Sequence, residues 1–263
     1  MVLQLSGVTG RRMRQLLVIS LLSVLLLAGK NAAALSLQYG GAKTESDKRA
    51  QQVISESSNV EQAIRLLNEN WQLKESLLVR LGGVDGPEYD PEQSLITIPY
   101  GFYAEVQQRF IDDGLNLNEA RRAALDALLH TVYHEMAHAL IDRYQVPVIG
   151  IEEDAADALA TILLLEWYPD GAQKAIHAGD LFDLESSDYT EIDEEQLAGE
   201  HSLDAQRAYR TYCLVAGADE EYAQQFEASG LFSPERLDTC SEDYQRVRSA
   251  WLRLIEDYVL SQP

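Results

Sequence analysis

Hydrophobic residues recur at helical spacing along much of the chain, and the longest such run lies in its middle. From Glu119 to about Tyr144 the chain contains neither Gly nor Pro, and apolar residues return every three or four positions. Asn116, followed three residues later by Glu119, resembles a capping box that starts a helix. The pattern therefore predicts one long helix, which Pro147 and Gly150 bring to an end.

The same periodicity predicts further elements on both sides of this helix. We expect other helices at 60–73, 100–112, 152–167, from 202 or 204 to 215, 219–229 and 241–260. The runs at 76–81 and 94–99 predict two strands, which could pair antiparallel across the Gly- and Pro-containing segment between them. An edge of the second strand could bind an extended peptide, or the strand could be internal. The expected fold is α+β and mainly helical, with a small β-sheet beside the long helix.

The N-terminal residues 1–34 have the pattern of a secretory signal peptide. Three arginines precede an apolar run from Leu16 to Ala28, and the Ala-Ala-Ala sequence at 32–34 offers a cleavage site. Because this run is shorter than the roughly 20 residues that span a bilayer, we expect cleavage rather than stable membrane insertion; an uncleaved anchor is the alternative. The remainder is predicted to be a flexible, polar lead-in at 35–59 and one domain over 60–263, periplasmic or secreted.

Composition and charge narrow the range of partners. The chain has 43 acidic and 21 basic residues, a formal charge of −22, and the charged residues of the first 34 are all basic. Such a negative protein repels nucleic acid and anionic lipid, so neither is expected as a partner. Cys213 and Cys240 are the two cysteines, and in an exported protein an even pair predicts one disulfide.

The long helix carries two histidines in the segment His134-Glu135-Met136-Ala137-His138. Their spacing places both imidazoles on one face about one turn apart, where they can share one metal ion. Glu135 lies about 100° around the helix from His134 and would face a water molecule rather than the metal. A pair of surface histidines is the alternative, but this pair lies among core-facing apolar residues, where unpaired imidazoles are costly.

A catalytic zinc needs a third protein ligand and a fourth position for water or substrate. On the next predicted helix, Glu153 and Asp157 are four residues apart and share a face. Glu153 is the candidate third ligand, and Asp157 could accept the free N–H of a ligand histidine and fix its tautomer. Glu152 and Asp154 are predicted to point elsewhere. The alternative is an acidic helix N-terminus whose carboxylates interact only with the helix dipole.

These residues resemble the Glu-zincins, a group typified by thermolysin and the CAAX prenyl proteases, whose motifs are H-E-x-x-H followed by E-x-x-[AS]-D. The resemblance implies that His134, His138 and Glu153 are zinc ligands. It also implies that Asp157 is a carboxylate supporting a ligand histidine and that Glu135 is the general base. The stretch 133–164, the segment 200–207 and the cysteine pair further resemble a bacterial family of metallopeptidases of otherwise unknown function. That family often carries more cysteines near the strands, where this chain has Gly82 and Pro99.

The expected function is therefore that of an exported metallopeptidase that hydrolyses peptide bonds with a zinc-activated water and Glu135 as general base. The developing oxyanion needs a donor besides the metal. His201 is the candidate, with the alternative that it is a solvated surface histidine; the rival donors are Tyr133, Tyr144 and Tyr189. His130 is expected to be a core or supporting residue, because a third ligand on the same helix would strain a tetrahedral site.

Two alternatives stay open at this point. The chain could be a zincin-like scaffold or binding protein without peptidase activity, although a structural zinc site has no use for a base at Glu135. The segment 180–200 holds nine Asp or Glu residues and could bind calcium or gate the cleft, but a solvated loop is the simpler interpretation.

Overall fold

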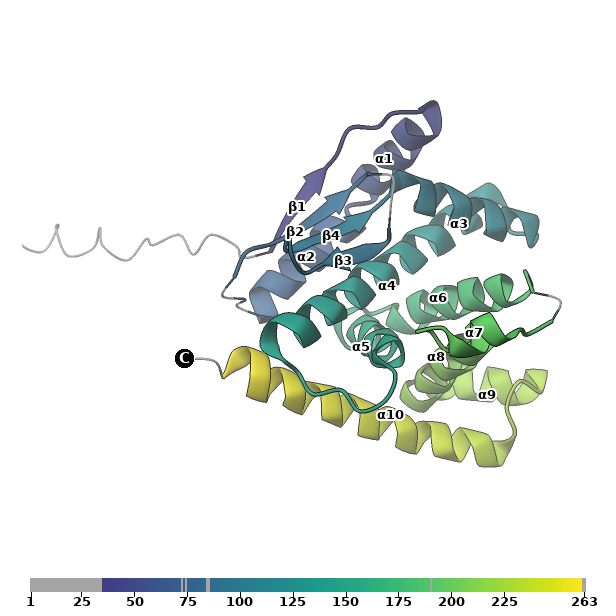
Figure 1. Ribbon diagram of the computed structural model, residues 1–263. Coiled ribbons are helices and arrows are strands. Elements are labelled where there is room, and N and C mark those ends of the chain that lie inside the picture. Colours follow the sequence, from purple (N-terminus) through teal and green to yellow (C-terminus); the bar gives the residue numbers. More distant parts are fainter. Residues whose placement is uncertain (1–34, 72, 74, 84–85, 190, 262–263) are drawn as a thin grey trace, which may run out of the picture. The chain divides into compact units, whose positions relative to one another are not determined.

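The computed structural model describes residues 35–261 apart from 72, 74, 84–85 and 190, so the predicted signal peptide lies outside the described residues (Figure 1). The elements in chain order are β1 (Leu35–Tyr39), α1 (Glu45–Ser57), α2 (Asn59–Asn70), β2 (Leu77–Leu81), β3 (Glu88–Asp90), β4 (Leu95–Ile98), α3 (Tyr100–Asp112), α4 (Leu117–Tyr144), α5 (Glu152–Trp167), α6 (Gly171–Ser186), α7 (Glu194–Ala198), α8 (Asp204–Ala218), α9 (Glu220–Ser229), α10 (Pro234–Leu254) and the π-helical turn η1 (Ile255–Leu260). The expected fold class, α+β and mainly helical with a small sheet, is confirmed.

The four described strands form one sheet in the order β1-β2-β4-β3. β1, β2 and β4 are parallel, with Val79 of β2 opposite Ile96 of β4, and β3 is antiparallel to β4. The antiparallel pairing predicted for the segments now seen as β2 and β4 is wrong. The intervening chain supplies β3, which forms a hairpin with β4, so β4 returns in the direction of β2. β4 is thus an internal strand, and the edge beside α4 belongs to β3.

The flexible lead-in predicted for residues 35–59 is also wrong, because this segment supplies β1 and α1. Thr44 caps α1, and Asp47 completes a capping box with it. Most of α1 is polar, but Ala50 and Ile54 lie one turn apart and are 2 % and 1 % exposed. The cap and the burial of these apolar residues therefore stabilise a helix in a segment whose average composition is that of a loop.

Helix α4 lies at the centre of the molecule, between the sheet and the group of helices formed by α5, α6, α8 and α10 (Figure 1). Asn116 caps it as predicted, accepting hydrogen bonds from the backbone N–H groups of Asn118 and Glu119. Because α4 contacts neighbours on both sides, every residue from Ala123 to Ile141 except Thr131 and His138 is buried. Polar side chains in that stretch are consequently held in fixed positions by the packing around them.

The acidic segment 180–200, which we predicted to be a loop, is helical in part, because α6 continues to Ser186 and the short helix α7 follows at Glu194–Ala198. Gly179 explains why α6 packs tightly on α8, since a Cβ atom there would lie 2.5 Å from the ring of Tyr212. The glycine that weakens the helical pattern in the sequence is thus the residue that permits the close approach of the two helices.

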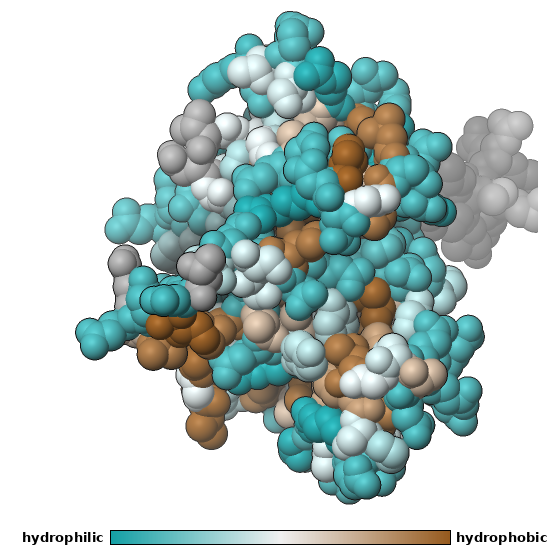
Figure 2. Space-filling model, turned by 90° about the vertical axis from the view of Figure 1, so that its right-hand side faces the viewer, coloured by the Kyte–Doolittle hydropathy of each residue, from teal (hydrophilic) through white to brown (hydrophobic). Residues whose placement is uncertain are grey.

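The predicted disulfide between Cys213 and Cys240 is present and joins α8 to α10. No described helix combines the length and the hydropathy needed to span a bilayer. Figure 2 shows a face of the molecule that is mostly hydrophilic, with its hydrophobic residues gathered in separate patches.

Candidate metal centre

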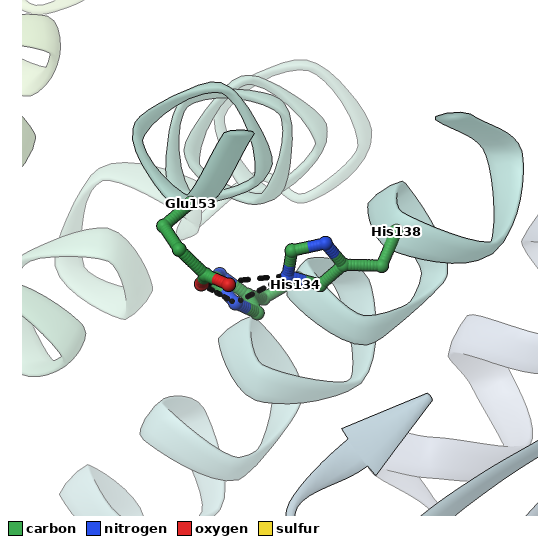
Figure 3. Close-up of side chains that lie close together, drawn as sticks. All are labelled: His134, His138 and Glu153. Atoms are coloured by element: carbon green, nitrogen blue, oxygen red, sulfur yellow. Dashed lines mark hydrogen bonds and ion pairs between the residues drawn. The ribbon is translucent and has the colours of Figure 1, made fainter. Parts of the chain in front are cut away.

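Two consecutive helices bring together the residues that the sequence singled out. His134 and His138 project from one face of α4, with their ring centroids 4.8 Å apart. The connection after α4 turns the chain back, and α5 begins at Glu152, so that Glu153 in its first turn reaches the two imidazoles (Figure 3). Among the described residues, His134, His138 and Glu153 are the group of side chains placed to hold a metal ion.

The potential ligand atoms converge on one point. The Nε2 atoms of His134 and His138 are 3.1 Å apart. Oε2 of Glu153 lies 3.0 Å from the first and 3.4 Å from the second. A tetrahedral zinc with Zn–N distances of about 2.0–2.1 Å places neighbouring ligand atoms about 3.4 Å from one another. The three atoms therefore lie close to the separation that such an ion imposes.

The tautomers of the histidines decide what can lie between these atoms. His134 Nδ1 is 2.7 Å from Oδ1 of Asp157, and His138 Nδ1 is 2.8 Å from Oε1 of Glu152. A carboxylate accepts hydrogen bonds, so both Nδ1 atoms carry the proton and both Nε2 atoms of the neutral rings carry lone pairs. These lone pairs face the buried Oε2 of Glu153, which accepts no well-formed hydrogen bond from any described residue. Three acceptors directed at one point fit a bound cation.

The two supporting carboxylates differ from the sequence-based expectation in one respect. Asp157 contacts His134 as we expected, whereas Glu152, predicted to point elsewhere, contacts His138 instead. Asp154 does point away and pairs with Arg210 of α8. The direction predicted for Glu152 from its position on the helix is wrong, because a long side chain in the first turn of a helix can fold back toward the preceding helix.

Arg207 of α8 is a residue of this site that sequence reasoning missed. Its Nε donates to Oδ2 of Asp157 at 2.7 Å, and its Nη2 donates to Oδ1 at 3.0 Å. Its guanidinium also lies over the ring of Phe182, 3.9 Å from the centroid. The arginine therefore fixes the carboxylate that in turn orients His134. An arginine fifty residues beyond its partner carries no local signal of this contact.

Burial and neighbouring charges shift the pKa values in the site. Burial opposes protonation of His134, but its contacts with Asp157 and Glu153 outweigh burial and raise its pKa to about 9. Burial opposes ionisation of Glu153 and Asp157, yet the close contacts of both with the histidines, and for Asp157 the hydrogen bonds from Arg207, lower both pKa values well below their usual range in the metal-free protein. Both carboxylates are therefore charged at neutral pH and attract a cation.

Glu135 lies beside the centre and lines a cleft with a volume of about 810 Å³. The side chain is buried, with the residue 6 % exposed, and it makes no hydrogen bond or ion pair with any described residue. Burial raises the pKa of its carboxyl group above the usual value. A buried carboxyl group that faces a cleft without a protein partner is arranged to interact with water or a bound molecule.

His201, between α7 and α8, also reaches the cleft. Its Nε2 lies 2.9 Å from Oε2 of Glu153, and half of its side chain is exposed. Two of the alternative candidates for the oxyanion donor lie elsewhere. Tyr133 is buried and its hydroxyl group is hydrogen-bonded to that of Tyr168, and Tyr144 is not among the residues that line the cleft. Tyr189 lines an adjoining cavity of about 780 Å³, which shares His201 with the cleft.

His130 is a core residue, in keeping with one of the two expectations for it. It is 2 % exposed, lies 3.4 Å from the hydroxyl of Thr161 and packs edge-on against Phe182. Burial lowers its pKa to about 4, so the ring is neutral. It borders the site without joining the three converging atoms.

A comparison with known protein families matches residues 39–255 to a family described as "Putative metallopeptidase". The match covers most of the chain and confirms the resemblance inferred from its motifs. Searches of curated proteins and of solved structures gave no match.

Proposed function

The chain belongs to this family of putative metallopeptidases, and on that premise we propose that it is a zinc-dependent peptidase centred on His134, His138 and Glu153. The observation that carries the proposal is the convergence of two imidazole lone pairs and one carboxylate oxygen on a single point. Two nitrogen donors and one oxygen donor form a ligand set that suits catalytic zinc, which keeps a further position for water or substrate.

The residues around the centre have complementary roles in this proposal. Zinc, when bound, supplies a Lewis acid that polarises the scissile carbonyl and acidifies water. Glu135 accepts the proton of the attacking water and passes it to the nitrogen of the leaving amine. His201 donates a hydrogen bond from Nε2 to the developing oxyanion. Asp157 and Glu152 hold the Nδ1 protons and so keep both ligand histidines in the required tautomer.

The surroundings of the cleft support a peptide as the substrate. β3 is an edge strand of the sheet, and its residues Glu88 and Tyr89 line the cleft that holds Glu135. An extended peptide can hydrogen-bond to the free edge of such a strand and so pass the zinc centre with its carbonyl groups in reach. In this proposal β3 binds the extended peptide, a role that the sequence suggested for the strand at 94–99.

Export is the second part of the proposal. The disulfide between Cys213 and Cys240 and the signal-peptide pattern at 1–34 support a periplasmic or secreted protein, because disulfides persist in oxidising compartments. A peptide or protein is the proposed partner, and the negative charge disfavours nucleic acid.

The competing function is a zinc-binding scaffold without hydrolysis, and Glu135 distinguishes the two. The test measures zinc content and cleavage of a mixed peptide library by the wild-type protein and by Glu135→Gln. A peptidase binds one zinc per chain in both forms, is inhibited by a zinc chelator, and loses cleavage in Glu135→Gln. One zinc per chain with no cleavage at any pH would establish the scaffold instead.

A further inference from the structure

The cleft at the candidate centre has an unusual charge. Among the residues that the structure describes, its lining includes no Lys or Arg and six acidic residues, which are Glu88, Glu135, Asp142, Glu152, Glu153 and Glu200. The chain as a whole has about one basic residue for every two acidic ones, so a random sample of its surface with six acids would include about three bases. The general acidity of the protein therefore does not account for the absence of basic residues here.

Three of these acids have no part in the proposed metal centre. Glu88 lies on β3, Asp142 near the end of α4, and Glu200 on the segment before α8, so they approach the cleft from three different elements. All three are exposed, and no described basic side chain pairs with any of them. Asp142 accepts a hydrogen bond of 2.9 Å from Tyr89, which fixes its carboxylate while leaving its charge uncompensated.

A bound divalent cation would not reverse this charge. Its two positive charges are balanced by Glu153, a candidate ligand, and by Glu135, which is buried beside it without a protein partner. The ligand histidines are neutral when they bind metal. The carboxylates of Glu88, Asp142, Glu152 and Glu200 then remain, and a concave surface with low-dielectric walls concentrates their field.

The negative lining continues beyond the cleft. The adjoining cavity shares Glu200 and His201 with it and adds four acids, Glu185, Asp188, Glu191 and Asp204. Its two basic residues are already paired, Arg109 with Asp188 at 2.9 Å and Arg207 with Asp157 at 2.7 Å. A polypeptide that extends from the cleft into the adjoining cavity would therefore meet further carboxylates there.

We propose that this site acts on cationic peptides, and that Glu88, Asp142 and Glu200 select Lys or Arg side chains that flank the scissile bond. The inference rests on the proposed peptidase function and specifies its substrate class. Attraction to three carboxylates raises the local concentration of a basic peptide and repels an acidic one. Since these carboxylates are exposed, added salt weakens the selection.

The test measures binding apart from turnover. Zinc-loaded Glu135→Gln is titrated with two labelled peptides that share one sequence but carry either two Lys or two Glu residues around the central bond, and fluorescence anisotropy gives the affinities. We expect at least tenfold tighter binding of the Lys peptide at 20 mM NaCl and a clearly smaller ratio at 300 mM. Equal affinity for the two peptides would overturn the inference.

Matched charge variants locate the effect. In the same background, Glu88→Gln, Asp142→Asn and Glu200→Gln together should reduce the preference to about twofold or less. The control removes the same three charges from exposed positions outside both cavities, with Glu227→Gln, Asp238→Asn and Glu242→Gln, and should keep most of the preference. A control that loses the preference equally would assign it to overall charge and overturn the role of the cleft.

Wild-type cleavage of the same peptides separates this inference from the function on which it rests. Cleavage of both peptides at equal kcat/KM would retain the peptidase and overturn the substrate class. Absence of any cleavage with one zinc per chain would overturn the peptidase, while the anisotropy ratio would still measure the charge preference of the cleft.

Discussion

Replacement of Asp157 by Asn should weaken zinc binding far more than the corresponding change at Glu152. Each carboxylate contacts the Nδ1 atom of one histidine, at 2.7 Å for His134 and 2.8 Å for His138. Their surroundings differ, because the side chain of Asp157 is 10 % exposed and that of Glu152 is 49 % exposed. Solvent therefore screens the second contact and can replace it, but not the first.

The structure also sets the size of the effect. Loss of a carboxylate that supports a metal-binding histidine typically costs 10–100-fold in metal affinity, which corresponds to about 1.4–2.7 kcal/mol. Asp157→Asn should lie in this range for a second reason. Arg207 donates to both oxygens of Asp157, so the NH₂ group of Asn would face a donor that it cannot accept. For Glu152→Gln we expect less than about fivefold, since one amide oxygen can still accept from His138.

The assay is a zinc titration in competition with a chromogenic chelator at pH 7.5. Circular dichroism of the metal-free variants, recorded first, checks that both remain folded, because Arg207 is largely buried and loses part of its partner in Asp157→Asn. An equal loss of affinity in the two variants, or a larger loss in Glu152→Gln, would refute the argument that burial and Arg207 make Asp157 the dominant support.

Three further predictions concern the ligands and the disulfide. His134→Ala and Glu153→Ala should each abolish stoichiometric zinc binding, as measured by metal analysis after dialysis; zinc retained in Glu153→Ala would exclude that residue as the third ligand. In the metal-free protein the pKa of His134 is raised to about 9, so its contribution to stability is complete below about pH 6.5 and is lost as the pH rises through 9. The Tm of the metal-free form should fall over that window, and a Tm that stays constant or rises would contradict the assigned contacts. Replacing both Cys213 and Cys240 by Ser opens a closed loop with a sequence separation of 27 and should lower the free energy of unfolding by about 3.5 kcal/mol in chemical denaturation; an unchanged value would show that the link adds no stability.

Local patterns in the sequence were sufficient to predict which residues come together at the candidate centre. The capping box at Asn116 and the run without Gly or Pro located α4, and the helical spacing of His134 and His138 placed both rings on one face. Two helices joined by a short connection also predict that Glu153 comes close to them. These inferences depend on residues near one another in the chain, where geometry follows from the helical repeat.

Contacts between distant segments were beyond such reasoning. The pairing of β1 with β2 depends on a strand that precedes two helices, and its polar surroundings predicted a flexible segment. Arg207 joins Asp157 only because α8 packs on α5. The rotamer of Glu152 depends on the position of the preceding helix. In each case the missing information was tertiary packing, which overrides local preference.

The close spacing of the ligands along the chain has a consequence for the order of folding. His134, His138 and Glu153 lie on two successive helices, so bringing them together closes only a short loop at a small cost in entropy. His201 and Arg207 arrive from a later part of the chain and require α8 to dock. The α4–α5 pair can therefore assemble the ligand set before the cleft is complete. A metal ion bound at that stage would stabilise the α4–α5 pair before the rest of the cleft is added.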